Sequence, residues 1–470
     1  IVAVVPRAPL RRCLDLGRVD MRTVLHGAQI DVTESGDLQE AVRTLPPEGG
    51  AIHVPAGTYE IDRTVLCELA EGQHLHLYGD GRASVLVFTG KDGSPFFSVR
   101  GVENSWWPDL RVTFRDLSFV GNHASGDALF LRWPNDMLID SCFFHGFGGT
   151  AIRVTPNASN VCVRDCWMRD CRRALHADNL HHLTFRGNQT RSMKDGLVQD
   201  EQIYIGRHCR EVRLVDNHLA YGHAEAIILD GTAQHAVCNN MIEGFQTGIA
   251  AVDCRDITIC ANYIHCPQGI LLTGDTRGFV VSGNIFTNNS EGALMVTESL
   301  GSGGHVLTGN VVRQSVYNDG QRGFDLGDAV ACVVRDNVFE DLDDGLAVRA
   351  TRSWLGGEQG NIVSDTLAHA AGECDVDPDV ALEPGSAYQP LFEYLESVDS
   401  DVGRLTLTSW ELRRIVGEAI PAEAWEEPGW WANTAETPQG RAWLSAGWLI
   451  VIAKRIEGRV VLARTHSDMG

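Results

Sequence analysis

An asparagine-marked repeat constrains the fold of this chain more than any other feature of its sequence. The phrase x-x-Asn-x-apolar places Asn at positions 188, 217, 240, 262, 284, 310 and 337, so successive Asn are 29, 23, 22, 22, 26 and 27 residues apart. Leu117, Cys142 and Cys166 hold the same slot upstream. About ten residues after each slot comes a second phrase, Gly/Ala-apolar-x-apolar, as in 248–251 and 269–272.

A repeat of this length, with two or three short alternating strands, cannot bury its own apolar face. Stacked on its neighbours at about 4.8 Å, it forms a continuous core. The Asn is expected at a tight turn in the left-handed conformation, bonded to its equivalents in adjacent coils. The pattern therefore predicts an all-β solenoid with ten coils over residues 112–350. Leucine-rich repeats have similar periods, but their Leu-x-x-Leu-x-Leu pattern is absent.

The segment before the repeats predicts a cap. Residues 36–46 read as one amphipathic helix ended by proline, and Gly-Gly-Ala-Ile-His-Val-Pro-Ala-Gly-Thr-Tyr follows at 49–59. Such a helix can cover the open end of a coil stack, where strand edges would otherwise lack partners.

The helix, the 49–59 phrase and the Asn-marked coils together resemble the pectin lyase-like superfamily of right-handed parallel β-helix proteins, over residues 30–365. The resemblance implies a right-handed parallel β-helix of about ten or more coils with an N-terminal capping helix. The family includes pectate lyases, polygalacturonases, polysaccharide epimerases, phage tailspikes and uncharacterised cytosolic members. The Asn-Thr-Asp and Gly-His-Gly phrases of polygalacturonases and the Asp-Pro-His-Asp phrase of alginate epimerases are absent here. No activity therefore carries over residue by residue.

Four regions are predicted along the chain: a poorly structured extension at 1–29, the β-helix at 30–365, a linker at 366–386 and a small α+β domain at 387–466. Met21 is expected to be the natural start. The last region resembles a small uncharacterised bacterial domain, with helices near 390–396 and 412–416 and a hairpin of 449–453 and 459–464. Its tryptophans are expected to form either a core or a recognition surface: Trp425, Trp430, Trp431, Trp443 and Trp448.

Alternation along the strand after each Asn-marked turn predicts which side chains face outward. Placing large apolar residues inside leaves an ionisable zone on coils one to five and an apolar zone, Ala250 to Val296, on later coils. In the last coil of the apolar zone, Leu294 and Val296 are predicted to face outward. An imidazole, a phenol and a guanidinium beside carboxylates could carry out acid–base chemistry on a sugar. In β-elimination a base removes the proton next to a uronic carboxylate, an Arg or metal neutralises that carboxylate, and a Tyr or His protonates the leaving oxygen. The predicted catalytic residues in this zone are Arg153, His176, Tyr204 and Asp178, and the predicted substrate-binding residues are Arg132, Asp230 and Trp133. Plain ladders of surface charge pairs are the competing interpretation.

Two further features suggest sites. The longest coil contains the insertion 193–201, in which Lys194 is a candidate base or carboxylate clamp, or part of a solvated loop. An acidic series ends successive strands, and calcium could bridge it, although Asp is also common at turns for conformational reasons alone. This series is Asp230, Asp253, Asp275, Glu298 and Asp328. No resident cofactor or metal is otherwise predicted.

Composition limits the partners. The 62 acidic residues against 39 basic ones give a net charge of −23, which argues against a nucleic-acid or anionic-membrane binder. The 13 scattered Cys read as reduced, buried thiols and predict a cytoplasmic location.

Two functions remain open: an enzyme acting on a polysaccharide at the ionisable zone, as a lyase or hydrolase, and a non-catalytic scaffold whose C-terminal domain recognises something else. Missing enzyme motifs and free Cys favour the scaffold, whereas the ionisable zone favours the enzyme. The apolar zone could bind a protein partner or a second subunit.

Overall fold

In this computed structural model of the chain, the described residues are 28–35, 37–103, 110–192, 199–297, 302–313, 322–340, 342, 347–350, 361–364, 381–383, 385–399, 402–417, 420–421, 424, 428–431, 433–454 and 459–464. The chain divides into two compact units, Ile1–Ile362 and Val363–Gly470. Residues 1–27 of the predicted extension and 366–380 of the predicted linker lie outside the described residues.

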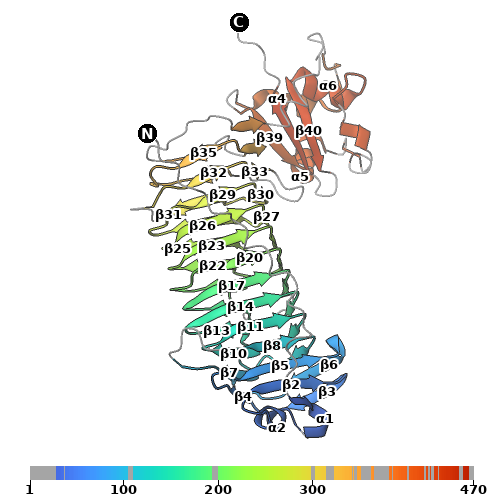
Figure 1. Cartoon of the computed structure of the whole chain (residues 1–470). Coiled ribbons are helices and arrows are strands. Elements are labelled where there is room, and N and C mark those ends of the chain that lie inside the picture. The colour runs from blue at the N-terminus through green and yellow to red at the C-terminus, as the bar shows by residue number, and fades with distance from the viewer. Residues whose placement is uncertain are drawn as a thin grey trace, which may run out of the picture. The chain divides into compact units, whose positions relative to one another are not determined.

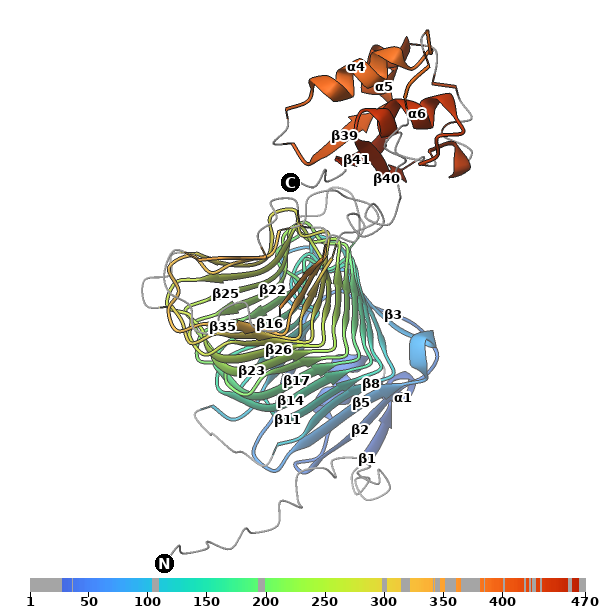
Figure 2. The ribbon, with the colours of Figure 1, turned by 90° about the horizontal axis from the view of Figure 1, so that it is seen from above.

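Three parallel sheets form the first unit, with the strands of successive coils stacked over one another (Figures 1 and 2). Sheet A has 13 strands: β1 (Ala28–Asp31), β2 (Gly49–Val54), β5 (His74–Gly79), β8 (Val112–Arg115), β11 (Asn135–Asp140), β14 (Ala158–Arg164), β17 (Leu180–Arg186), β20 (Arg213–Val215), β23 (Ala233–Cys238), β26 (Arg255–Cys260), β29 (Val280–Ser282), β32 (Val306–Thr308) and β35 (Val333–Arg335).

Sheet B follows sheet A in each coil and also has 13 strands. They are β3 (Gly57–Ile61), β6 (Ser84–Phe88), β9 (Ser118–Val120), β12 (Phe143–His145), β15 (Trp167–Arg169), β18 (Gln189–Arg191), β21 (His218–Ala220), β24 (Met241–Glu243), β27 (Tyr263–His265), β30 (Ile285–Thr287), β33 (Val311–Val312), β36 (Val338–Glu340) and β38 (Ile362–Ser364).

Sheet C completes each coil with 12 strands. They are β4 (Val65–Glu68), β7 (Phe97–Arg100), β10 (Leu129–Arg132), β13 (Thr150–Val154), β16 (Arg173–Ala177), β19 (Ile203–Ile205), β22 (Glu225–Asp230), β25 (Thr247–Val252), β28 (Gln268–Thr273), β31 (Gly292–Thr297), β34 (Phe324–Asp325) and β37 (Val348–Arg349). The predicted all-β solenoid is confirmed.

The core lies inside the coils because inward side chains of one strand stack on those of the next. In β14 and β17, Val161 faces Leu183 and Val163 faces Phe185, and all four are buried. Burying such side chains contributes about 2 kcal/mol each, and the stacking repeats from coil to coil.

The predicted column of asparagines, here called the asparagine ladder, is confirmed at the corner between sheets A and B. The backbone N–H and the side-chain Nδ2 of Asn240 both donate to Oδ1 of Asn262, at 2.9 Å each. Nδ2 also donates to the Leu214 carbonyl at 2.9 Å. The same bonds join Asn188, Asn217, Asn240, Asn262, Asn284, Asn310, Asn337 and Asn361.

The prediction that each Asn of the ladder adopts the left-handed conformation is wrong. The positive φ belongs to the residue before it, as in Asp216 (58°), Asn239 (56°) and Ala261 (54°). The preceding residue makes the turn, which leaves the Asn side chain pointing inward to reach the next coil.

A short helical cap covers one end of the solenoid. Helices α1 (Val32–Ser35) and α2 (Leu38–Arg43) fall within or beside the predicted segment, and the Asp37 side chain caps α2 by accepting from Glu40 N–H. Gln39 bonds both the N–H and the carbonyl of Leu66 in β4, at 2.8 and 3.0 Å. Its amide therefore satisfies backbone groups on the edge strand of sheet C, as a cap should.

The second unit contains α4 (Gln389–Ser397), α5 (Ser409–Val416), the 3-10 turn η5 (Pro428–Trp431) and α6 (Pro438–Ser445). The strands β39 (Arg404–Thr408), β40 (Trp448–Lys454) and β41 (Arg459–Arg464) form an antiparallel sheet, of which β39 was not predicted. Thr408 and Glu411 make the capping box at the start of α5. Trp431, Trp443 and Trp448 are buried in the core and Trp430 packs against it, while Trp425 is outside the described residues.

Across the described part of the chain, the helices are all too short or too polar to span a bilayer.

Candidate functional site

Sheet C brings three of the predicted site residues, Arg153, His176 and Tyr204, into one column. Phe130, Arg153, His176, Tyr204 and Ile228 are successive Cα partners on β10, β13, β16, β19 and β22. All five side chains are half-exposed, so the outward register predicted for these coils is correct.

His176 lies at the centre of this column. Its Nε2 is 2.7 Å from Oδ2 of Asp178, and its Nδ1 is 3.2 Å from a terminal nitrogen of Arg173. A guanidinium can only donate, so Nδ1 accepts and Nε2 carries the proton that Asp178 accepts. The imidazole is therefore neutral in this arrangement, with both nitrogens engaged.

Tyr204 stacks on His176, with ring centroids 4.9 Å apart and the planes 21° from parallel. Its hydroxyl donates to Oδ2 of Asp230 at 2.8 Å. Burial raises the pKa of the Tyr204 hydroxyl well above its ordinary value, and the neighbouring Asp230 raises it further. Tyr204 is consequently held as a phenol, which can donate a proton but cannot act as a base near neutral pH.

Arg173 is a member of this cluster that the sequence interpretation missed. Its side chain is only 14% exposed and pairs with Asp200 at 2.9 Å and with Glu201 at 2.6 Å. Burial raises the pKa of the Glu201 carboxyl, and the charge of Arg173 opposes that rise. Arg173 and Glu201 each lie three residues before the outward residue of their coil, His176 or Tyr204, outside the alternating pattern of the strand.

Arg153 and two of the three predicted substrate-binding residues, Arg132 and Trp133, lie in a different environment. Arg153 pairs with Asp127 at 2.9 Å. Arg132 lies over the Trp133 ring at 5.8 Å from its centroid, and Arg100 lies over the same ring at 5.0 Å. The spacing of the coils also predicts Asp178 close to Arg132 and Arg153; in the structure Asp178 accepts from Nε2 of His176. Lys194 lies outside the described residues.

We define the sheet C cluster as Arg173, His176, Asp178, Glu201, Tyr204 and Asp230. It joins a proton donor, an imidazole, a buried guanidinium and three carboxyls on one half-exposed face. Such a set can move protons and hold an anionic group, provided that a ligand displaces part of the internal bonding.

The apolar zone on later coils begins as predicted but changes register at β31. Leu271 of β28 pairs with Met295, and Thr273 pairs with Thr297. Met295 is therefore the outward residue, whereas the predicted Leu294 and Val296 are buried. Three consecutive large apolar residues made the alternation ambiguous, and the Gly292 of the repeat phrase pairs with Gln268 rather than with Gly269.

The acidic series does not gather into a metal site among the described residues, where no group of three or more His, Cys, Asp or Glu side chains could hold an ion. Both oxygens of Asp275 are 2.7 Å from guanidinium nitrogens of Arg255 and Arg277, which offset its charge. These contacts lower the pKa of Asp275, with Arg277 the larger cause. Glu298 is outside the described residues.

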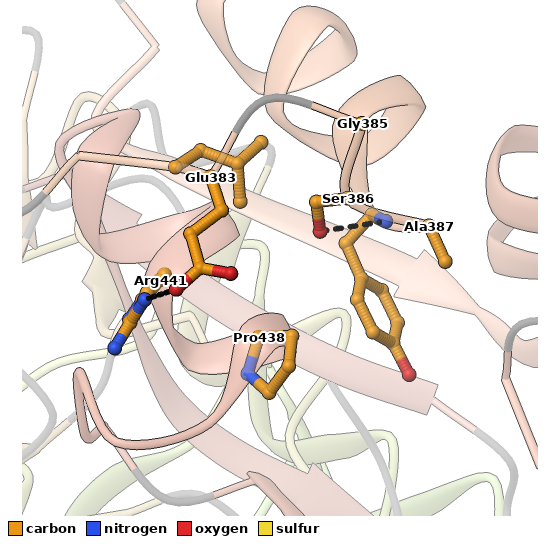
Figure 3. A pocket seen from close by; sticks show the side chains of 8 residues that line it. Glu383, Gly385, Ser386, Ala387, Pro438 and Arg441 are labelled. Carbon is orange, nitrogen blue, oxygen red and sulfur yellow. Dashed lines mark hydrogen bonds and ion pairs between the residues drawn. The ribbon is translucent and has the colours of Figure 1, made fainter.

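A pocket of about 280 Å³ lies in the second unit, between the segment before α4 and the start of α6 (Figure 3). Glu383 pairs with Arg441 at this pocket, and Tyr388 also lines it. Burial raises the pKa of the Tyr388 hydroxyl.

Comparison with known proteins agrees with this architecture. Residues 201–366 match the family described as "Right handed beta helix region". The first unit is a right-handed parallel β-helix, as the resemblance to pectin lyase-like proteins predicts. Residues 388–465 match "Domain of unknown function (DUF7662)". The predicted resemblance of the last region to a small uncharacterised domain is therefore also confirmed. No curated protein matches the chain.

Solved structures similar to the β-helix have varied functions. The mannuronan C-5 epimerase AlgE6 A-module of Azotobacter vinelandii is 15% identical and has a TM-score of 0.45, with 72% of this chain and 99% of that chain covered. A GH87 alpha-1,3-glucanase of Streptomyces thermodiastaticus is 14% identical and has a TM-score of 0.48, with 72% of this chain and 70% of that chain covered. PfbA, a surface adhesin of Streptococcus pneumoniae, is 13% identical and has a TM-score of 0.40, with 72% of this chain and 92% of that chain covered. These likenesses concern the fold alone.

Proposed function

We propose that this β-helix protein cleaves an acidic polysaccharide by β-elimination on the outer face of sheet C. The observation that carries the proposal is the pairing of His176 with Asp178 next to Tyr204, whose hydroxyl is held protonated. An oriented imidazole and a phenol on neighbouring strands are the base and acid that an elimination requires.

In the proposed reaction, Arg153 binds the uronate carboxylate, since it neighbours His176 in register. The substrate displaces Arg173 from Nδ1 of His176, and Nδ1 then takes the proton from the carbon next to the carboxylate. The electron pair of that C–H bond forms the new C=C bond, and the adjacent C–O bond breaks. The leaving oxygen takes the proton of Tyr204, while Asp178 holds Nε2–H of the imidazolium. Proton exchange with water restores both residues.

The decisive experiment offers the full-length protein a panel of uronate-containing and neutral polysaccharides, with and without calcium. Elimination yields both new reducing ends and unsaturated products that absorb in the ultraviolet. Reducing ends without absorbance would contradict elimination and support hydrolysis, in which Glu201 with its raised pKa is the candidate acid.

A second candidate, the non-catalytic scaffold, is favoured by one observation: the cluster is already internally bonded, from Arg173 to Glu201, His176 to Asp178 and Tyr204 to Asp230. Saccharide binding without any product, together with unchanged binding by Tyr204→Phe, would establish this function and exclude the enzyme.

We also propose a cytoplasmic location. The eleven cysteines within the described residues are all free, and Sγ of Cys238 lies 2.6 Å from Sγ of Cys260 on the next coil. An oxidising compartment would favour a bond between such neighbours. Thiol titration of protein from its native cells should find both reduced, and a disulfide between them would contradict this location.

A further inference from the structure

The corner where sheet A passes into sheet B carries an unusual concentration of arginine in two adjacent coils. The outward residues on either side of the turn are Arg164, Trp167 and Arg169 in one coil, and Arg186, Gln189 and Arg191 in the next. Arg164 is the Cα partner of Arg186, and Arg169 is the Cα partner of Arg191, so Arg stacks on Arg at both edges of the corner. Between them, Trp167 is the partner of Gln189.

Stacked guanidinium groups one strand spacing apart, about 4.8 Å, repel one another unless anions lie between them. Asp140 pairs with Arg164 at 2.8 Å, and Asp170 pairs with Arg169 at 3.3 Å. Within the described part of the chain, no carboxylate comes within ion-pair distance of Arg186 or Arg191, and both are exposed. Arg164 and Arg169 are therefore offset by ion pairs within the described residues, whereas Arg186 and Arg191 are not, although Arg191 lies over the Tyr221 ring at 4.9 Å from its centroid. These two exposed cations stand out on a chain of net charge −23.

The corner also presents groups suited to a sugar. Arg82, from the turn η2 (Gly81–Ala83), lies 4.7 Å from the centroid of the Trp167 ring and 5.0 Å from that of Phe143. This packing fixes the orientation of a half-exposed indole beside the arginines. The exposed amide of Gln189, directly above Trp167, can both donate to and accept from hydroxyl groups.

We propose that this arginine corner is a second binding site, separate from the sheet C cluster, for a saccharide that carries carboxylates. Arg186 and Arg191 bind carboxylates of successive sugar units, Trp167 packs on a sugar ring, and Gln189 binds hydroxyls. The repulsive charge of the whole chain disfavours dense polyphosphates and favours a polymer with widely spaced charges. The choice of a saccharide rests on the proposed function, whereas the existence of an anion site at the corner does not.

The test measures binding of polygalacturonate oligomers to the full-length protein by calorimetry. The double variant Arg186→Gln/Arg191→Gln should weaken binding by about tenfold or more, because two charge-assisted contacts are lost. The matched control is Arg255→Gln/Arg277→Gln, which removes two arginines that are paired in register one coil apart and already pair with Asp275. The control should bind as the unaltered protein does, and Trp167→Ala should also weaken binding.

Equal weakening in the test and control variants would overturn the site, since only the overall charge would then matter. Tighter corner-dependent binding of inorganic polyphosphate than of polygalacturonate would overturn the saccharide assignment. If the protein makes no product but its binding of polygalacturonate still depends on Arg186 and Arg191, the proposed elimination is contradicted and the arginine corner is supported. The two proposals can therefore fail independently.

Discussion

Two polar networks in the same β-helix differ in burial and in extent. The asparagine ladder is buried and continues through seven fully enclosed Asn from Asn188 to Asn337. The sheet C cluster is half-exposed and confined to the strands β16, β19 and β22 and the residues flanking them. Inside the coils a polar group without a partner is costly, so the ladder repeats wherever the turn repeats. On the outer face that constraint is absent.

How often a polar residue recurs from coil to coil indicates whether it serves stacking or a ligand. A residue that recurs in every coil serves the stacking, whereas ionisable residues that occur in only a few coils are free to serve a ligand. The apolar outer residues Ala250, Leu271 and Met295, in the same column as His176 and Tyr204, show that stacking itself does not require the cluster.

Breaking the ladder should have the largest effect. Asn262→Ala removes the acceptor of two bonds from Asn240 and the donors of bonds to Asn284 and Val237. Because the remaining groups stay buried without partners, the free energy of unfolding should fall by about 3–4 kcal/mol. Chemical unfolding measures this value. Thr258→Ala, on the outer face of the same coil, should change it little, and an equal loss in both variants would contradict the ladder's special role.

Disabling the cluster should affect activity and leave stability unchanged. His176→Gln removes the proposed base while keeping a side chain that can bond Asp178, so the rate of product formation should fall about 100-fold. Initial rates with a saturating uronate polymer measure this. The control His182→Gln alters an exposed His–Glu pair at 2.8 Å on sheet A and should retain full activity. A loss of the same size in the control would exclude a role for His176 in the reaction.

Lowering the pH should reduce the stability of the solenoid through its buried histidines. Burial lowers the pKa of His235 and of His305 to about 4, and each accepts a backbone N–H at Nδ1. The unfolded chain binds protons at these sites near pH 6.5, above the folded pKa, so stability is fully present above pH 6.5 and falls as the pH drops toward 4. At pH 5 the loss should be about 2 kcal/mol per histidine.

Unfolding curves of the unaltered protein and of His235→Gln between pH 7 and pH 5 test this expectation. The variant should be less stable at neutral pH but should lose less stability on acidification. Parallel pH profiles of the two proteins would show that His235 does not bind a proton on unfolding.

The smallest effect is expected at the surface charge pairs. Asp275→Asn weakens the contacts with Arg255 and Arg277, which are all exposed to water. Solvent screens such pairs, so neither the unfolding midpoint nor its dependence on salt should change measurably. A clear fall in the midpoint would mean that this pair belongs with the ladder as a structural network.

The candidate site shows how far sequence interpretation reached. The outward positions of His176 and Tyr204 followed from alternation alone, because inward and outward residues must alternate on a strand with one buried face. Arg173 and Glu201 were missed because Arg173 begins β16 and Glu201 precedes β19, where the chain leaves a turn and alternation does not apply. Leu294 was misplaced because apolar residues at three successive positions leave the register undecided.

The period of the coils, the column of asparagines and the inner face of most strands could be predicted from the sequence, because these features recur and each must satisfy the same packing in every coil. Which charged residues meet depends on the tertiary structure: Arg173 rather than Arg153 lies at His176, and Arg186 and Arg191 have no ion pair within the described residues. Such contacts join residues on different coils, and turn lengths and side-chain reach set them rather than any pattern along the chain.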